Sequence, residues 1–174
     1  MIYRFLILFI TFSPLILKAL PPLSEVRAQF YAGVEDEEKT KKLIKALFPE
    51  KDKLPPIYLG YLGASQALLA KHCFNPYNKL DFLNKSIITF QTAISREPEN
   101  LEIRFLRFSV QHFLPSFLGM SKNLSEDRDV IIEQIKKKNY PAEDLQLVKN
   151  VTSFLLESKR CTNSQQIFLK SNLL

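Results

Sequence analysis

The sequence is poor in glycine, cysteine and histidine, and it contains no tryptophan. Of its 174 residues, 4 are glycine, 2 are cysteine and 2 are histidine. Four glycines are too few for glycine-rich phosphate-binding loops or for the many tight turns of an all-β fold. The chain also lacks the short motifs of serine hydrolases, zinc metalloproteases, P-loop proteins and dinucleotide-binding folds. These absences argue against the enzyme classes that a short motif identifies.

Two histidines and two cysteines also leave little from which to build a metal centre. A zinc site needs about four ligands at short, regular spacings. The chain has no Cys-x-x-Cys and no His-x-x-x-His pattern, and the four residues lie in three separate segments. A Cys–His catalytic pair would have to join Cys73 to His112, because neighbours on a helix do not face each other. We therefore expect no metal, no cofactor and no catalytic residue.

The abundant residues, among them leucine, phenylalanine, lysine and glutamate, favour helices around an apolar core. Hydrophobic residues make up 46% and charged residues 24% of the chain, which suits one globular domain. After residue 20, apolar residues recur at spacings of three and four, without the sustained alternation of a β-strand. We predict a single all-α domain over residues 23–174, built as a stack of about seven helices in antiparallel hairpins. The expected helices cover about residues 24–32, 36–48, 57–74, 76–97 and 99–114, two more begin near residues 125 and 141, and the tail from residue 163 adds a short one.

Capping residues mark the start of four of these helices. Ser24, Asp36, Asn75 and Ser125 each precede a helical pattern, and their side chains can accept hydrogen bonds from the first turn. Pro76 follows Asn75 and suits the first helical position. The run LLAKHCFNPYNKL, which places lysine, histidine and cysteine side by side, is therefore interpreted as the end of one helix and the capped start of the next.

Residues 1–20 have the layout of a secretory signal peptide. Arg4 precedes an apolar run over residues 5–17, which is shorter than the ~20 residues that a membrane-spanning helix needs. Pro14 would also weaken a spanning helix. We expect export to the periplasm or the extracellular space, with cleavage near Ala19. The alternative is that residues 5–17 remain as an uncleaved anchor, in which case the domain would associate with the membrane surface.

The net charge is mildly basic. It is +6 for the whole chain, and loss of Arg4 and Lys18 with the signal would lower it by two, to +4. The basic clusters at residues 39–42 and 136–138 have acidic residues nearby in the same helix, which is typical of a solvated helix face. Together with export, this pattern argues against nucleic acid as a partner.

Cys73 and Cys161 are the two cysteines of the chain. In an oxidising compartment an even pair can form a disulfide, which here would join the C-terminal segment to the middle of the fold. The alternative is two separate thiols, because the sequence does not supply the Cα separation that a disulfide requires.

Residues 57–110 resemble a tetratricopeptide repeat. The resemblance is carried by Ser86, Phe90, Ala93 and Pro98, which stand at the steps of a small residue, an aromatic, alanine and proline in the second helix of that repeat, with Gly63 in the preceding helix. Gly63 and Ser86 are 23 residues apart, whereas a 34-residue repeat would separate them by about 12. The resemblance implies a stack of helical hairpins that binds a peptide or protein on one face, without catalysis.

One helix contains the best candidate for a ligand site. Arg104, Arg107 and Gln111 share a face at spacings of three and four, and His112 lies beside it. Paired arginines can hold a carboxylate or phosphate bidentately. The alternative, which we favour, is that they form structural ion pairs with helix acids such as Glu99, Glu102 or Asp81, or mark an exposed stripe.

Two further basic residues and one loop complete the candidates. Lys71 and His72 lie in a last helical turn, where the helix dipole favours cations, and they are candidate partner contacts. Phe117 and Leu118 lie in a loop that can dock a partner or, as we expect, fold back on the core. The function that fits best is an exported, non-catalytic adaptor or scaffold that binds another protein through its helical surface. The alternative is a small-anion binder, or an enzyme of unrecognised type, that uses the Arg104 face.

Overall fold

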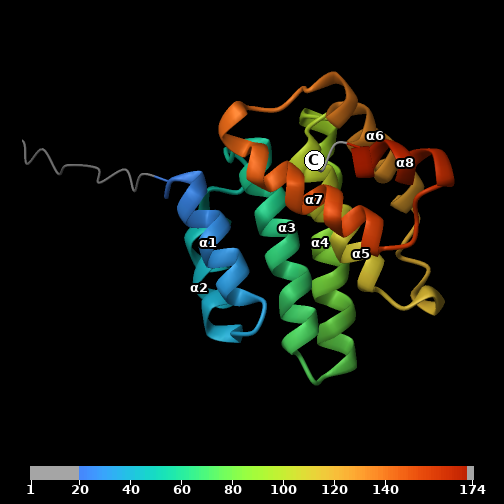
Figure 1. The fold of residues 1–174 in the computed structure, drawn as a ribbon. Helices are drawn as coiled ribbons and strands as arrows, with labels where there is room; N and C mark the ends of the chain where they lie inside the picture. Colours follow the sequence, from blue (N-terminus) through green and yellow to red (C-terminus); the bar gives the residue numbers. More distant parts are fainter. Residues whose placement is uncertain (1–19, 172–174) are drawn as a thin grey trace, which may run out of the picture.

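The computed structural model describes residues 20–171, which fold into helices and connecting segments (Figure 1). This range contains eight α-helices and three short 3₁₀ helices, and no β-strand. The α-helices are α1 (Leu23–Gly33), α2 (Glu37–Leu47), α3 (Pro56–His72), α4 (Pro76–Arg96), α5 (Leu101–Phe113), α6 (Leu124–Lys137), α7 (Leu145–Glu157) and α8 (Asn163–Ser171). The 3₁₀ helices are η1 (Phe48–Glu50), η2 (Ser116–Leu118) and η3 (Ala142–Asp144). The predicted all-α class is confirmed, and the segment after residue 163 is the eighth helix.

Side-chain caps begin three of the helices. Asp36, Asn75 and Asn100 each accept hydrogen bonds from the backbone N–H groups two and three residues later, at 2.9–3.3 Å. The predicted caps at Ser24 and Ser125 are wrong: both residues lie inside the first turn, and the residues at the cap positions make no side-chain cap bond. Helix α1 instead follows Pro22, whose backbone oxygen accepts from the N–H groups of Glu25 and Val26.

Helix α3 packs against both α4 and α5, and two glycines allow this close packing. A Cβ added at Gly60 would stand 3.4 Å from the side chains of Ile103 and Leu106 in α5. A Cβ added at Gly63 would stand 3.3 Å from the ring of Phe90 in α4, tighter than an ordinary van der Waals contact. Without side chains at these positions, α3 can approach both neighbours at once.

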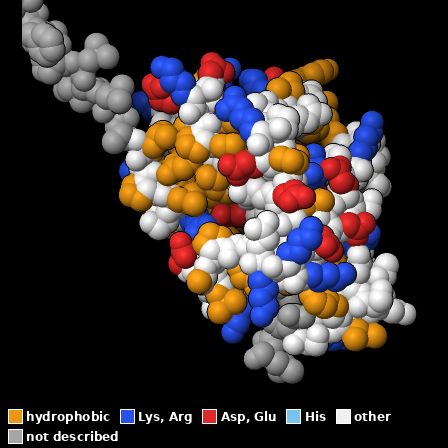
Figure 2. All heavy atoms as spheres, turned by 90° about the horizontal axis from the view of Figure 1, so that it is seen from above, with side chains coloured by type: hydrophobic (Ala, Val, Ile, Leu, Met, Phe, Trp, Pro, Cys, Tyr) orange, Lys and Arg blue, Asp and Glu red, His pale blue; other side chains and the backbone are white. Residues whose placement is uncertain are grey.

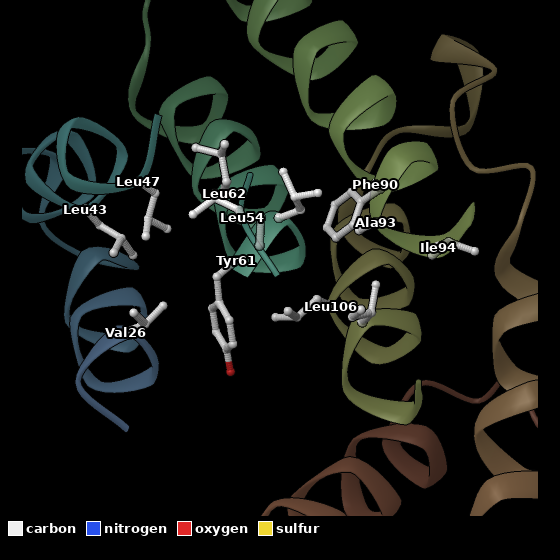
Figure 3. Close-up of a cluster of buried hydrophobic side chains, with 13 residues drawn as sticks. Val26, Leu43, Leu47, Leu54, Tyr61, Leu62, Phe90, Ala93, Ile94 and Leu106 are labelled. Carbon is white, nitrogen blue, oxygen red and sulfur yellow. The ribbon is translucent and has the colours of Figure 1, made fainter. Parts of the chain in front are cut away.

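The first hydrophobic cluster fills the space between helices α1 to α5. Its labelled members in Figure 3 include Val26, Leu43, Tyr61, Phe90 and Leu106, one from each of the five helices. The carbon side chains converge, whereas the hydroxyl of Tyr61 points away from them (Figure 3). Each of these five side chains is nearly or wholly buried, so the cluster supplies the apolar burial that holds the N-terminal half together.

A second cluster joins α5 to helices α6, α7 and α8. It contains Phe108 of α5, Ile131 of α6, Val151 of α7 and Leu169 of α8, all at 0% exposure. Helix α7 runs obliquely across the bundle (Figure 1), and the ring of Phe154 packs edge-on against α5. Helix α5 therefore contributes to both clusters, as its apolar residues around most of its circumference predict.

Three of the residues that carry the repeat resemblance, Gly63, Ser86 and Phe90, lie at the contact between α3 and α4. A Cβ added at Gly63 would meet the ring of Phe90 and would stand 3.4 Å from the backbone oxygen of Ser86. The two helices form a hairpin with a short connection (Figure 1), but the resemblance to a tetratricopeptide repeat stays a prediction. The predicted signal segment lies outside the described residues. Within residues 20–171, no helix combines the length and the apolar character needed to cross a bilayer.

Candidate functional site

Arg104 and Arg107, the centre of the predicted ligand face, lie in a buried ion-pair cluster. Asp127, with no exposed side-chain surface, accepts from Arg104 Nη1 at 2.9 Å and from Arg107 Nε and Nη2 at 2.7 and 2.6 Å. Glu126 accepts from Arg104 Nη1 at 2.5 Å and from Arg107 Nη2 at 3.4 Å. Arg104 Nε donates to the backbone oxygen of Pro98 at 2.7 Å. The guanidinium groups are thus occupied by protein partners.

The two acids come from the first turn of α6, and not from the residues that we expected. The expected partners of Arg104 and Arg107 were Glu99, Glu102 or Asp81, but none of these contacts them in the structure. Acids in the first turn are stabilised by the positive end of the helix dipole. These carboxylates reach the arginines because α6 packs against α5. The spacing of residues along α5 does not predict this contact.

The ion pairs of this cluster shift the pKa values of Arg104 and Glu126. Burial opposes the charge of Arg104, but its hydrogen bonds with Glu126 and Asp127 outweigh that effect and raise its pKa. The hydrogen bond from Arg104 lowers the pKa of Glu126. Both shifts favour the charged forms of these side chains. This suits ion pairs that hold α5 against α6 better than it suits an acid–base site, whose groups must gain and lose protons.

The other two predicted members of this face have different roles. Gln111 Oε1 accepts from the backbone N–H of Asn123 at 2.9 Å, and its amide donates to the Asn123 side chain at 3.2 Å. His112 turns away from this pair, and its Nδ1 accepts from Arg160 Nε at 2.9 Å. The four residues predicted as one ligand-binding set are thus divided between an ion-pair cluster, a loop contact and a separate aromatic environment.

His112 lies among aromatic rings. Its ring stacks on Phe108 with centroids 6.2 Å apart and meets Phe113 and Phe154 edge-on. Burial, together with the positive charge of Arg160, lowers the pKa of His112. The hydrogen bond from Arg160 requires an unprotonated Nδ1, so the neutral imidazole is the form that this environment stabilises.

Lys71 and His72 contact the turn between α1 and α2. Lys71 Nζ donates to the backbone oxygen of Val34 at 2.7 Å and to Glu35 at 2.8 Å. His72 Nε2 donates to the backbone oxygen of Gly33 at 3.0 Å. The two residues thus fasten the end of α3 to the neighbouring hairpin, and neither lies near His112 in the contacts of the described chain.

A second, partly buried charge network was not predicted from the sequence. Arg27 of α1 donates to both oxygens of Glu102 at 2.8 and 2.6 Å and to Asp144 of η3 at 2.7 Å. The hydroxyl of Tyr61 donates to Glu102 at 2.5 Å. Burial and the charge of Glu102 raise the pKa of Tyr61, so its hydroxyl remains a donor. The signal available in the sequence was an acid within the apolar pattern of α5, at Glu102.

The two cysteines are separate thiols in the structure, which is one of the two alternatives that the sequence left open. Cys73 lies between α3 and α4, and its Sγ is 3.5 Å from the backbone oxygen of Asn75. Cys161 lies between α7 and α8, and its buried Sγ is 3.5 Å from the backbone oxygen of Leu155. Burial raises the pKa of the Cys161 thiol. Each thiol has its own neighbours, in different connections of the fold.

Large apolar side chains are exposed on the α3–α4 hairpin. Phe74 at its tip is 101% exposed, and Tyr77 and Ile88 on α4 are 83% and 63% exposed. Phe117 in η2 is also 85% exposed, so the expected folding of that loop onto the core is wrong for this residue. On the face that Figure 2 shows, hydrophobic side chains gather on one side and acidic and basic side chains are interspersed elsewhere.

Comparisons with protein-family models, with curated proteins and with solved structures find no match to this chain. Within residues 20–171, no group of three or more histidine, cysteine or acidic side chains is arranged to hold a metal ion.

Proposed function

We propose that this chain is an exported, non-catalytic adaptor or scaffold that binds another protein through the outer surface of its α3–α4 hairpin. The observation that supports this proposal is the exposure of Phe74, Tyr77, Leu80 and Ile88, which we call the hairpin surface. Single exposed apolar residues are common on proteins, but an aligned group on one element is typical of a binding surface.

The hairpin surface follows one line along α4. Tyr77, Leu80 and Ile88 are separated by three and then eight residues, which places all three on the same helical face. The opposite face of α4 is buried through residues such as Leu83 and Phe90. A partner helix or loop can therefore meet a surface whose position the core already holds, at little entropic cost.

The charges around the hairpin surface suggest the chemistry of the partner. Helix α4 carries Lys79, Lys85 and Arg96 but a single acid, Asp81. Lys85 is paired with Asp81 at 2.6 Å, whereas Lys79 has no acidic partner in the described chain. The fitting partner presents apolar side chains flanked by acidic groups, because opposite charge at the rim speeds association and excludes other partners.

The test is co-purification from the native envelope fraction, followed by mass spectrometry, with two matched double variants. Tyr77→Ser/Ile88→Ser removes two residues of the hairpin surface, whereas Tyr31→Ser/Ile167→Ser removes the same two residue types at exposed positions elsewhere. We expect one partner to be retained by the wild type and the control and lost from the hairpin variant at an unchanged melting temperature. Retention of the same partner by the hairpin variant, or a bound small molecule with no protein partner, would contradict the proposal.

Export rests on the sequence of residues 1–20 and is tested separately. Mass spectrometry of the chain made in its native cell is expected to show a mature N-terminus near Leu20 in an envelope or external fraction. An intact N-terminus in the membrane fraction would instead support the alternative, an anchor at residues 5–17.

A further inference from the structure

An open hollow of about 400 Å³ lies between the start of α6 and the connection from α7 to α8. Four of its seven lining residues are lysine or arginine, and none is acidic. Over the whole chain, by contrast, 24 basic residues are accompanied by 18 acidic ones. The residues that line this hollow, which we call the cationic hollow, are Ser121, Lys122, Leu124, Ser125, Arg128, Lys159 and Arg160.

The arginines of the cationic hollow are held in place by the protein. Arg128 Nη1 donates to the backbone oxygen of Arg160 at 2.7 Å, which ties α6 to the connection after α7. Arg160 Nε donates to His112 at 2.9 Å. Lys122 and Lys159, on the other hand, are exposed and pair with no acid in the described chain. The hollow thus combines fixed guanidinium groups with two lysines that are available for a ligand.

The first turn of α6 adds further positive potential. Asn123, at the cap position, makes no side-chain cap bond, and Leu124 and Ser125 line the hollow. Backbone N–H groups at a helix start attract anions. The nearest acids are already occupied: Glu126 binds Arg104 and Arg107, and Asp129 binds Arg128. Opposing negative charge is therefore reduced by ion pairs that the structure contains.

We infer that the cationic hollow binds a ligand that bears a phosphate group, with Lys122, Lys159 and Arg160 as charged contacts and Ser125 as a hydroxyl donor. Its volume lies within the range of roughly 300–1,000 Å³ that is usual for small-molecule sites. Phosphate suits this arrangement because its oxygens can accept from several cationic donors and from helix N–H groups at once. The site shares no lining residue with the hairpin surface or with the buried Arg104 cluster.

The backbone conformation of Lys159 allows this residue to be replaced by glycine without strain in the fold. Lys159 has φ +57° and Lys138, at the end of α6, has φ +50°, a left-handed conformation that glycine adopts without strain. Lys122→Gln/Lys159→Gly therefore removes two charges from the hollow, and Lys149→Gln/Lys138→Gly removes two charges elsewhere with the same backbone change. The two double variants are matched in net charge and in conformational effect.

The probes are inorganic pyrophosphate, measured by calorimetry, and vesicles of phosphatidylcholine with or without phosphatidic acid, measured by sedimentation. We expect the hollow variant to lose roughly tenfold or more in affinity and the control variant to bind like the wild type. Pyrophosphate binding supports a soluble phosphate ligand, and binding to phosphatidic acid vesicles alone supports a lipid headgroup. Equal weakening in both variants, which indicates net charge alone, or no wild-type binding to either probe, overturns the inference.

Discussion

Replacing Asp127 by asparagine tests the buried ion-pair cluster directly. Asp127→Asn keeps the shape of the side chain but removes the charge that faces Arg104 and Arg107. Only 6% and 9% of these two arginine side chains are exposed, so water cannot replace the lost carboxylate. Removing one partner of a buried ion pair costs about 3–5 kcal/mol. For a chain of this size, each kcal/mol lowers the melting temperature by about 2–4 °C, so we expect a fall of roughly 6–20 °C.

The matched control is Glu126→Gln, in the same turn and against the same arginines. The side chain of Glu126 is 52% exposed, so solvent screens its ion pairs and compensates for their loss. We expect a cost of at most about 1 kcal/mol for this change. Urea and thermal unfolding followed by circular dichroism give both values on the same preparations.

Two results would refute this reasoning. One is a cost for Asp127→Asn that does not exceed the cost for Glu126→Gln, because burial would then not decide the energy of the pairs. The other is an Arg104→Met/Arg107→Met variant that keeps its stability but loses binding of an anion or a partner. That result would show that the two arginines bind a ligand, which is the alternative that their spacing in the sequence suggested.

Three further predictions concern single side chains. Tyr61→Phe removes the hydroxyl that donates to buried Glu102, so we expect the free energy of unfolding to fall by about 1.5–3 kcal/mol, measured by urea unfolding. An unchanged urea midpoint would show that this hydrogen bond does not stabilise the fold. Folding lowers the pKa of His112, so the unfolded chain takes up a proton more readily than the folded chain as pH falls below about 6.5. Wild-type stability should therefore fall as the pH drops below this value, and the His112→Phe variant should lack this part of the fall. Equal slopes of stability against pH for the two proteins would contradict the assignment. Cys73 should react with a thiol reagent faster than the buried Cys161, whose thiol pKa is raised. If neither cysteine reacts until a reductant is added, the two form a disulfide and the prediction is wrong.

Helix positions followed from the sequence wherever short-range rules apply. Asp36 and Asn75 cap helices because a side chain and the N–H groups that it accepts from lie within three residues of each other. The same rule was wrong at Ser24 and Ser125, where each helix begins earlier than the polar residue suggests. The central place of α5 was also predictable, since apolar residues around most of a helix require neighbours on several sides.

The sequence by itself determined the helical class, most helix limits and the absence of a familiar catalytic motif, because these depend on residue types and on spacings within one or two turns. Tertiary structure alone decided the partners of the charged residues. Arg104 meets Asp127, and Arg27 meets Glu102 across 75 positions of sequence, because packing of separate helices sets these distances. It also decided that Lys122 and Lys159 line one hollow, whereas the adjacent His72 and Cys73 have separate surroundings.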